Sequence, residues 1–260
     1  MKKITAILTA IVLLLSVSPA FCEDNEHEIV ISQIFVPNYP APHVDEAEAV
    51  ADDYFDDAVF AGDSIVSSLE MYGQFTNAEF VSKIGLSPSA AANFHEFETP
   101  DNPKATFAEA IAYHKPKKVY LLLGSNGLDK KLSGDVILEY TDMLSTITTL
   151  LPETIIYVLG TPPMTKGKMA KYKNCSPGRY RVFNEELLKL CGEFNIYYLD
   201  IYGLVKNKNG YLNTKYSAGD GLHFNRDGCE LVAEYIKKHA VPYDTGAPAV
   251  TAEPPTDTEE

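Results

Sequence analysis

The chain has 260 residues, and its 36 acidic residues outnumber its 22 basic ones, so the formal net charge is −14. Phosphate backbones repel such a chain, which excludes nucleic acid as an expected partner. The central part, about 190 residues long, suffices for one domain with a full hydrophobic core.

The first 22 residues have the pattern of a signal peptide. Two lysines precede an apolar run from Ile4 to Val17, which ends in small residues near Ala20. The run is shorter than the roughly 20 residues that cross a bilayer as a helix, so we expect no transmembrane segment. We predict a secreted protein. A lipid anchor on Cys22 stays open, although Phe21 fits the position before such an anchor poorly.

Two polar flanks are expected to lie outside the main domain. Residues 23–56 form an acidic segment that contains prolines, and residues 243–260 form an acidic tail rich in Pro and Thr. Low hydrophobicity and high charge predict that the tail is disordered. The remaining residues, 57–242, are assigned to a single domain.

Within this domain, short apolar runs alternate with amphipathic segments. The runs have the length and composition of buried strands and lie at 58–61, 79–84, 118–123, 154–159 and 196–201. Helical spacing of apolar residues predicts helices at 65–72, 106–114, 134–151, 179–194 and 227–239. This alternation indicates a five-stranded parallel sheet covered on both faces, a three-layer α/β/α fold. Active sites in such folds lie beyond the carboxyl ends of the strands.

The first predicted strand ends in Gly62-Asp63-Ser64, and a helix follows. A serine there presents its hydroxyl at the carboxyl edge of the sheet. Its backbone N–H lies at a helix N-terminus, where developing negative charge is favoured. From this segment alone, a serine that only caps the helix is the simpler interpretation.

The second and third strands also end in residues suited to binding an oxyanion. Gly85 has no side chain to keep its backbone N–H from a substrate oxygen, although a glycine after a strand usually marks only a turn. Asn126, in Gly124-Ser125-Asn126, carries an amide that can donate to the same oxygen. An isolated asparagine more often bonds to its own loop.

Asp220 and His223 precede the last predicted helix. Their three-residue separation lets the carboxylate accept from the imidazole Nδ1–H, which leaves Nε2 free to take a proton. Such a pair alone is common by chance. The four elements in order, each at a strand end or before the closing helix, predict an acyl-transfer site.

These blocks, Gly62-Asp63-Ser64, Gly85, Gly124-x-Asn126 and Asp220-x-x-His223, resemble those of the SGNH hydrolase superfamily, also called GDSL lipases and acylhydrolases. The resemblance covers about Asp57 to His239. It implies a flavodoxin-like sheet and catalysis without metal or organic cofactor. It also implies that Ser64 is the nucleophile, that His223 and Asp220 activate it, and that Ser64, Gly85 and Asn126 form the oxyanion hole. One position departs from the family, because Gly127 stands where an aspartate often follows the asparagine.

The segment Met164 to Arg181 carries six basic residues and no acid, and it is interpreted as a long solvated loop. The functional alternative is a rim that receives an anionic substrate, made by Lys166, Lys168, Lys171 and Lys173.

The cysteines do not suggest a disulfide framework. Cys191 and Cys229 fall in register with apolar helix faces and are predicted to be buried, whereas Cys175 is expected to be a free thiol in a loop. The histidines other than His223 are scattered without ligand spacing, so we infer no metal site.

The sequence therefore predicts a secreted, monomeric serine esterase. Its substrate is expected to be a small-molecule or carbohydrate ester with a short acyl group, because no lid or long apolar helix is evident. The same fold also serves O-acyltransferases, lysophospholipase-like enzymes and non-catalytic binding proteins, and these stay open as alternatives.

Overall fold

The computed structural model of the protein describes residues 43–242. The predicted signal peptide, the Cys22 anchor, the first part of the acidic segment and the acidic tail lie outside the described residues. No helix in the described range is long and apolar enough to span a membrane.

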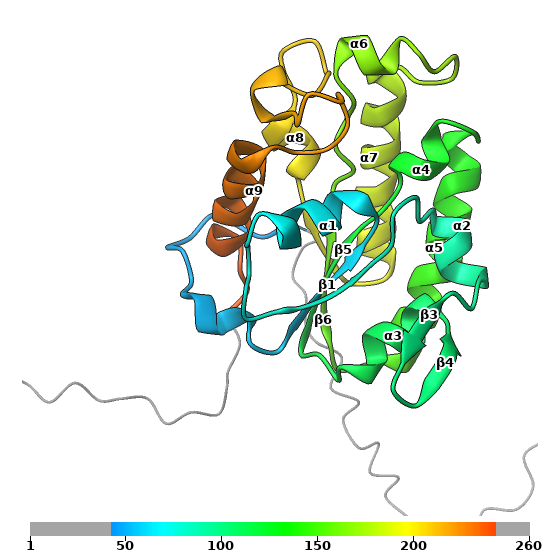
Figure 1. Cartoon of the computed structure of the whole chain (residues 1–260), viewed down its shortest axis with the longest axis vertical. Coiled ribbons are helices and arrows are strands. Elements are labelled where there is room, and N and C mark those ends of the chain that lie inside the picture. The colour runs from blue at the N-terminus through cyan, green and yellow to red at the C-terminus, as the bar shows by residue number, and fades with distance from the viewer. Residues whose placement is uncertain (1–42, 243–260) are drawn as a thin grey trace, which may run out of the picture. The chain divides into compact units, whose positions relative to one another are not determined.

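Five parallel strands form the central sheet, in the order β2-β1-β5-β6-β7. Their bounds are β1 Ala58–Gly62, β2 Glu79–Ser82, β5 Lys118–Leu122, β6 Ile155–Leu159 and β7 Tyr197–Leu199. Helices cover both faces of the sheet (Figure 1). The predicted three-layer α/β/α fold with a flavodoxin-like strand order is confirmed.

Alternate residues of each central strand enter two different cores. In β1, Val59 and Ala61 belong to one cluster, and Ala58 and Phe60 belong to the other. This is the period-two alternation of a strand whose two faces are both buried, which is why the run is continuously apolar.

A row of aromatic rings crosses the whole sheet on one face. Phe80, Phe60, Tyr120, Tyr157 and Tyr197 are register partners on successive strands. Neighbouring ring centroids lie 5.5, 4.6, 4.6 and 5.4 Å apart along this row. Stacked aromatic pairs add to the stabilisation from burial, so the row ties all five strands together.

All five predicted helices are present: α1 Ser64–Met71, α3 Phe107–Tyr113, α5 Ser133–Leu150, α7 Pro177–Glu193 and α9 Arg226–Lys238. Helices α1 and α9 lie against the core that contains Phe60, whereas α3, α5 and α7 lie against the opposite core. Parallel strands need such crossovers, which connect the carboxyl end of one strand to the start of the next.

Several short elements were not predicted. They are η2 Asp52–Phe55, α2 Pro88–Asn93, β3 Phe97–Thr99, β4 Asn102–Ala105, α4 Ser125–Leu128, α6 Lys166–Met169, α8 Ile201–Val205 and η3 Thr214–Tyr216. Strands β3 and β4 form a separate antiparallel pair. The short helices have too few turns to show a helical period, and β3 and β4 contain no continuous apolar run, which explains why the pattern missed them.

The interpretation of Met164 to Arg181 as one solvated loop is wrong. The segment contains α6 and the first turn of α7, and the side chains of Met164 and Met169 are buried in the core. Apolar anchors at both ends of α6 hold it against the domain despite its lysines.

Residues 43–56 pack on the domain. Phe55 is buried beside Phe60. The backbone N–H groups of Ala47 and Val50 donate to carbonyls at the end of α9, and Lys237 pairs with Asp52. Cys191 and Cys229 are buried free thiols and Cys175 is a half-buried free thiol, which confirms the interpretation of these three cysteines.

Candidate active site

Ser64 is the first residue of α1, and only Asp63 separates it from the end of β1. The residue that caps the helix is Asp63, whose side chain accepts a hydrogen bond from the backbone N–H of Ile65 at 2.9 Å. The interpretation of Ser64 as only a cap is therefore wrong, and its hydroxyl is available for another partner.

That partner is His223. The imidazole Nε2 lies 2.8 Å from Ser64 Oγ, and the Nδ1 lies 2.6 Å from Asp220 Oδ2. The three side chains thus form one hydrogen-bonded chain from carboxylate to hydroxyl, although 159 positions separate Ser64 from His223. This is the arrangement in which a histidine takes the proton of a serine nucleophile.

The turn between Asp220 and His223 fixes the acid. Asp220 Oδ1 accepts from the backbone N–H groups of Leu222 and His223 at 2.9 and 3.0 Å. Partial burial by itself raises the pKa of Asp220, but these N–H donors and the imidazole outweigh it and lower the pKa from its usual value. Asp220 is therefore ionised and is an acceptor for an Nδ1–H, while Nε2 on the other side of the ring faces Ser64.

Two backbone N–H groups near the nucleophile have no acceptor among the residues the structure describes: those of Ser64 and Gly85. They follow β1 and β2, which are paired neighbours in the sheet. Gly85 has a φ of 77°, a left-handed conformation that glycine adopts without strain. Gly85 is exposed, so its N–H group is open to a ligand. Donors without a protein acceptor at adjacent strand ends suit an oxyanion site.

Asn126 lies at the start of the short helix α4 and is half-buried. Its Nδ2 donates to Asp63 Oδ2 at 3.1 Å and to the carbonyl of Leu86 at 3.2 Å. Both partners lie outside its own loop, so the amide joins the ends of three strands rather than stabilising one turn. An oxyanion at this amide has to replace the Leu86 carbonyl as acceptor.

Asp63 is a candidate functional residue to which the sequence pattern assigned no role. It is fully buried, and its two oxygens accept from Ile65 and Asn126. Burial raises the pKa of Asp63 to about 7, against the lowering effects of the Ile65 N–H, the nearby His223 and the Asn126 amide. The sequence feature that could have indicated this role is an acidic residue between an apolar strand and Ser64, because an aspartate is rarely buried unless it is paired.

The departure at Gly127 has a steric cause. A Cβ at this position would lie 3.1 and 3.2 Å from the two methyl groups of Val136, a fully buried residue of α5. A side chain at this position therefore fits only if Val136 shifts by a few tenths of an ångström. The loop is held instead by the backbone N–H groups of Gly127 and Leu128, which donate to the carbonyl of Gly124.

Helix α6 packs directly on the turn that carries the acid and base. The backbone N–H of Thr165 donates to the carbonyl of Gly221 at 2.9 Å. A Cβ on Gly221 would lie 2.4 Å from Thr165 Oγ1 and 2.7 Å from Lys168 Cβ. The aliphatic part of the Lys168 side chain therefore packs against the turn. The predicted role of Lys168, in a basic rim, concerned only its charge.

The other lysines of the proposed rim are exposed. They are Lys166, Lys171 and Lys173. No contact in the described range links these three lysines to Ser64, His223 or Asp220. The rim that would receive an anionic substrate therefore stays a prediction. The described residues also contain no group of three His, Cys, Asp or Glu side chains arranged to hold a metal ion.

Comparison with known proteins finds one family in agreement with this site. The family model described as "GDSL-like Lipase/Acylhydrolase family" matches residues 60–231. That range contains Ser64, Asp220 and His223, and it also contains Gly85 and Asn126 of the expected oxyanion hole.

Individual relatives are more distant. The chain is 31% identical over 94 residues to GDSL esterase/lipase At2g38180 of Arabidopsis thaliana, which is 34% of this chain and 30% of that protein. The chain thus spans about a third of the length of this curated relative.

Two solved structures share the fold. A GDSL-like lipase from Bacteroides thetaiotaomicron is 15% identical, with 74% of this chain and 89% of that chain covered and a TM-score of 0.54. A structure from Streptococcus pneumonia is 17% identical, with 79% and 90% covered and a TM-score of 0.56. The expected SGNH hydrolase resemblance is thereby confirmed at the level of family and fold.

Proposed function

The chain belongs to the GDSL-like lipase/acylhydrolase family, and on that premise we propose that it hydrolyses carboxylic esters with Ser64 as the nucleophile. The observation that carries the proposal is the continuous hydrogen-bonded chain from Asp220 through His223 to Ser64 Oγ, with distances of 2.6 and 2.8 Å. Each member is in contact with the next, so no rearrangement is needed before proton transfer.

In the proposed reaction, Ser64 Oγ attacks the acyl carbonyl while Nε2 of His223 takes the hydroxyl proton. The ionised Asp220 stabilises the resulting imidazolium. His223 then returns the proton to the leaving alcohol, and the acyl group stays on Ser64. A water molecule, deprotonated by His223, releases the acid and restores the hydroxyl.

The tetrahedral intermediates carry an oxyanion, which we assign to the N–H groups of Ser64 and Gly85 and to the Asn126 amide. The first two have no acceptor in the described part of the chain, which supports this assignment. Asn126 releases the Leu86 carbonyl when the oxyanion forms, because a charged acceptor makes the stronger hydrogen bond.

We propose that the substrate is a short acyl group, acetyl to about butyryl, on a sugar or another polar alcohol. The turn that carries the catalytic pair supports this, because Ser217, Ala218 and Gly219 are small or polar and offer little apolar surface. A long acyl chain needs such surface at about 0.8 kcal/mol per methylene.

The nucleophile is tested by labelling the purified protein with a fluorophosphonate serine probe. We expect strong labelling of the parent and none of Ser64→Ala. The matched control is Ser67→Ala on the same helix, whose hydroxyl contacts Ser82 instead of the imidazole and which should label normally. Equal labelling of Ser64→Ala would place the nucleophile elsewhere, and an unlabelled parent would favour a non-catalytic binding protein.

The acyl preference is tested with p-nitrophenyl esters of two to sixteen carbons, followed by acetate release from acetylated xylan. We expect kcat/KM to fall beyond about four carbons, since little apolar surface receives the longer chains. A steady rise beyond eight carbons would replace the sugar-ester proposal with a lysophospholipase-like activity.

We also propose that the protein acts outside the cell, which the predicted signal peptide at residues 1–22 supports. Expression of the full chain in a bacterial host, with mass spectrometry of the exported product, tests this. An uncleaved product retained in the cytoplasm would contradict it.

A further inference from the structure

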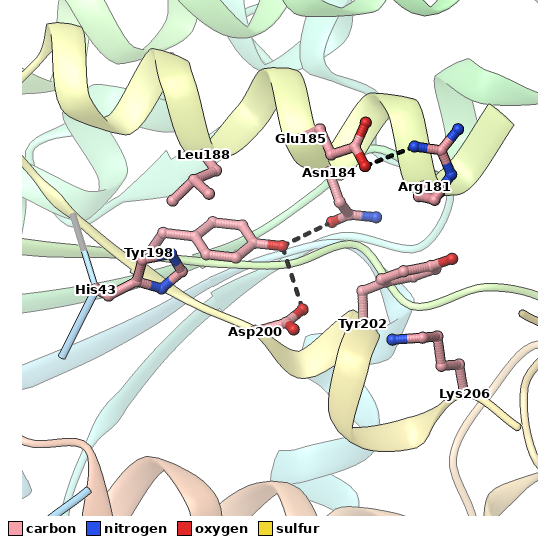
Figure 2. A pocket seen from close by; sticks show the side chains of 9 residues that line it. All are labelled: His43, Arg181, Asn184, Glu185, Leu188, Tyr198, Asp200, Tyr202 and Lys206. Atoms are coloured by element: carbon pink, nitrogen blue, oxygen red, sulfur yellow. Dashed lines mark hydrogen bonds and ion pairs between the residues drawn. The ribbon is translucent and has the colours of Figure 1, made fainter. Parts of the chain in front are cut away.

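A cavity of about 310 Å³ lies between α7, α8 and the carboxyl end of β7 (Figure 2). Helix α7 contributes Arg181 and Leu188 to its wall, and the β7 to α8 segment contributes Tyr198, Asp200, Tyr202 and Lys206. This volume falls within the range of small-molecule sites in proteins.

The cavity is separate from the proposed catalytic residues. None of Ser64, Asp220 and His223 lines it. Strand β7 is three positions from β1 in the sheet, which at about 4.8 Å per strand corresponds to roughly 14 Å. Both sites lie at the same edge of the sheet, because both follow the carboxyl ends of parallel strands.

The charges around the cavity cancel. Arg181 pairs with Glu185 at 2.6 Å, an interaction drawn in Figure 2. Lys206 and Asp200, of opposite sign, also line it, and His43 is the remaining titratable side chain of the wall. With histidine counted as neutral, the wall has no net charge. An anion or cation site needs an excess of the complementary charge, so this balance favours a neutral ligand that both donates and accepts hydrogen bonds.

The polar groups are held in place before any ligand arrives. Asp200 caps α8, since its Oδ1 accepts from the backbone N–H of Gly203 at 2.8 Å. The Tyr198 hydroxyl lies 3.2 Å from Asn184 Oδ1 and 3.5 Å from Asp200 Oδ1, and Asn184 is itself buried and bonded to backbone carbonyls. Fixed donors and acceptors lower the entropic cost of binding.

The rest of the wall is apolar and aromatic. Figure 2 shows Leu188 and the Tyr198 ring on one side of the cavity and Tyr202 on the other. The Lys206 ammonium lies 4.8 Å from the centroid of the Tyr202 ring, which holds the charge at the cavity mouth. Planar polar groups beside aromatic and aliphatic carbon match a pyranose, which has hydroxyls at its rim and C–H groups on its faces.

We propose that this cavity is a second binding site, which takes a neutral sugar unit apart from the catalytic serine. A sugar held there keeps a glycan chain beside the carboxyl edge of the sheet, where Ser64 lies. This biological role rests on the proposed esterase function, but the binding itself does not.

Binding is measured by titration calorimetry with xylohexaose, a neutral and unacylated probe, on the full mature chain carrying Ser64→Ala. We expect millimolar to micromolar affinity, at least fivefold weaker in Lys206→Ala and abolished in Leu188→Trp, which fills the cavity from the α7 wall. The matched control is Lys208→Ala, an exposed lysine two positions further that does not line the cavity.

The proposal would be overturned by the absence of heat from xylohexaose at 10 mM, or by binding that Lys206→Ala and Leu188→Trp leave unchanged. If inorganic phosphate bound more tightly than xylohexaose and this binding depended on Lys206, the cavity would be an anion site, which would also overturn the proposal. The circular dichroism spectrum of Leu188→Trp verifies that this variant folds. Hydrolysis of p-nitrophenyl acetate by the parent protein, measured separately, tests the esterase proposal alone, so a failure of sugar binding is distinguished from a failure of that proposal.

Discussion

Asn126 has two acceptors in the resting site, Asp63 and the Leu86 carbonyl, and a proposed third in the oxyanion. We predict that Asn126→Ala lowers kcat by roughly 10²–10³ with little change in KM, because the amide binds the oxyanion more strongly than the ground-state carbonyl. Steady-state kinetics on p-nitrophenyl acetate measures this. Asn93→Ala, an exposed asparagine on α2, is the control. If only KM changes, Asn126 positions the substrate instead.

Asp63 acts through Asn126 and Ile65 and touches no substrate in the proposed mechanism. We predict that Asp63→Asn lowers kcat about 10- to 100-fold, the range for residues that orient a catalytic group. The new amide presents N–H groups where the site needs two acceptors, so the Asn126 amide turns away. KM should change less than kcat. Full activity of this variant would show that Asn126 is held by the Leu86 carbonyl alone.

At the scale of elements, α6 and the Asp220–His223 turn form one unit. We predict that Gly221→Ala lowers kcat at least tenfold, since the added methyl group collides with Thr165 and Lys168 and displaces the turn. The matched control is Gly219→Ala, because Gly219 also has positive φ, 94° against 82°, but meets no atom within 4 Å. Equal losses in the two variants would mean that backbone strain matters and the α6 contact does not.

The aromatic row makes the five strands cooperative. Tyr120 lies at its centre, fully buried and stacked on Phe60 and Tyr157 at 4.6 Å. We predict that Tyr120→Ala lowers the free energy of unfolding by about 3–5 kcal/mol, the usual range for a buried aromatic residue. Urea unfolding followed by circular dichroism measures it. Tyr113→Ala, at a tyrosine that is 41% exposed, should cost less than about 1 kcal/mol.

At the scale of the whole molecule, Asp63 makes stability depend on pH. Its pKa is about 7 in the folded protein, against 3.8 as the ordinary value. Between these values the unfolded chain has lost the proton and the folded chain keeps it, so stability falls as pH rises. The loss begins near pH 4, ends just above pH 7, and amounts to an order of about 4 kcal/mol.

We therefore predict that the free energy of unfolding of the parent, relative to Asp63→Asn, decreases between pH 4 and pH 7.5. The variant has no titrating group at this position, and all other acids are shared, so the difference isolates Asp63. Parallel urea titrations at four pH values measure it. A constant difference would mean that the buried carboxyl group is ionised throughout this range.

The sequence by itself determined the layers of the fold, and it predicted that Ser64, His223 and Asp220 act together, three side chains that the structure shows hydrogen-bonded in a row. Apolar runs of strand length are typical of strands buried on both faces, and their alternation with helices indicates a parallel sheet. Such a sheet brings the carboxyl ends of its strands to one edge. Ser64, Gly85, Asn126 and His223 were therefore expected to meet there from chain order alone.

Only the tertiary structure decided what each polar side chain contacts. Asp63 rather than Ser64 caps α1, Asn126 bonds to two other strand ends, and Lys168 supports Gly221. The cavity lined by Arg181 and Lys206 could not be predicted from the sequence either. Hydrophobic periodicity specifies which face of an element is buried. It does not specify the contacts between segments tens of residues apart, which depend on how the elements and their short helices pack together.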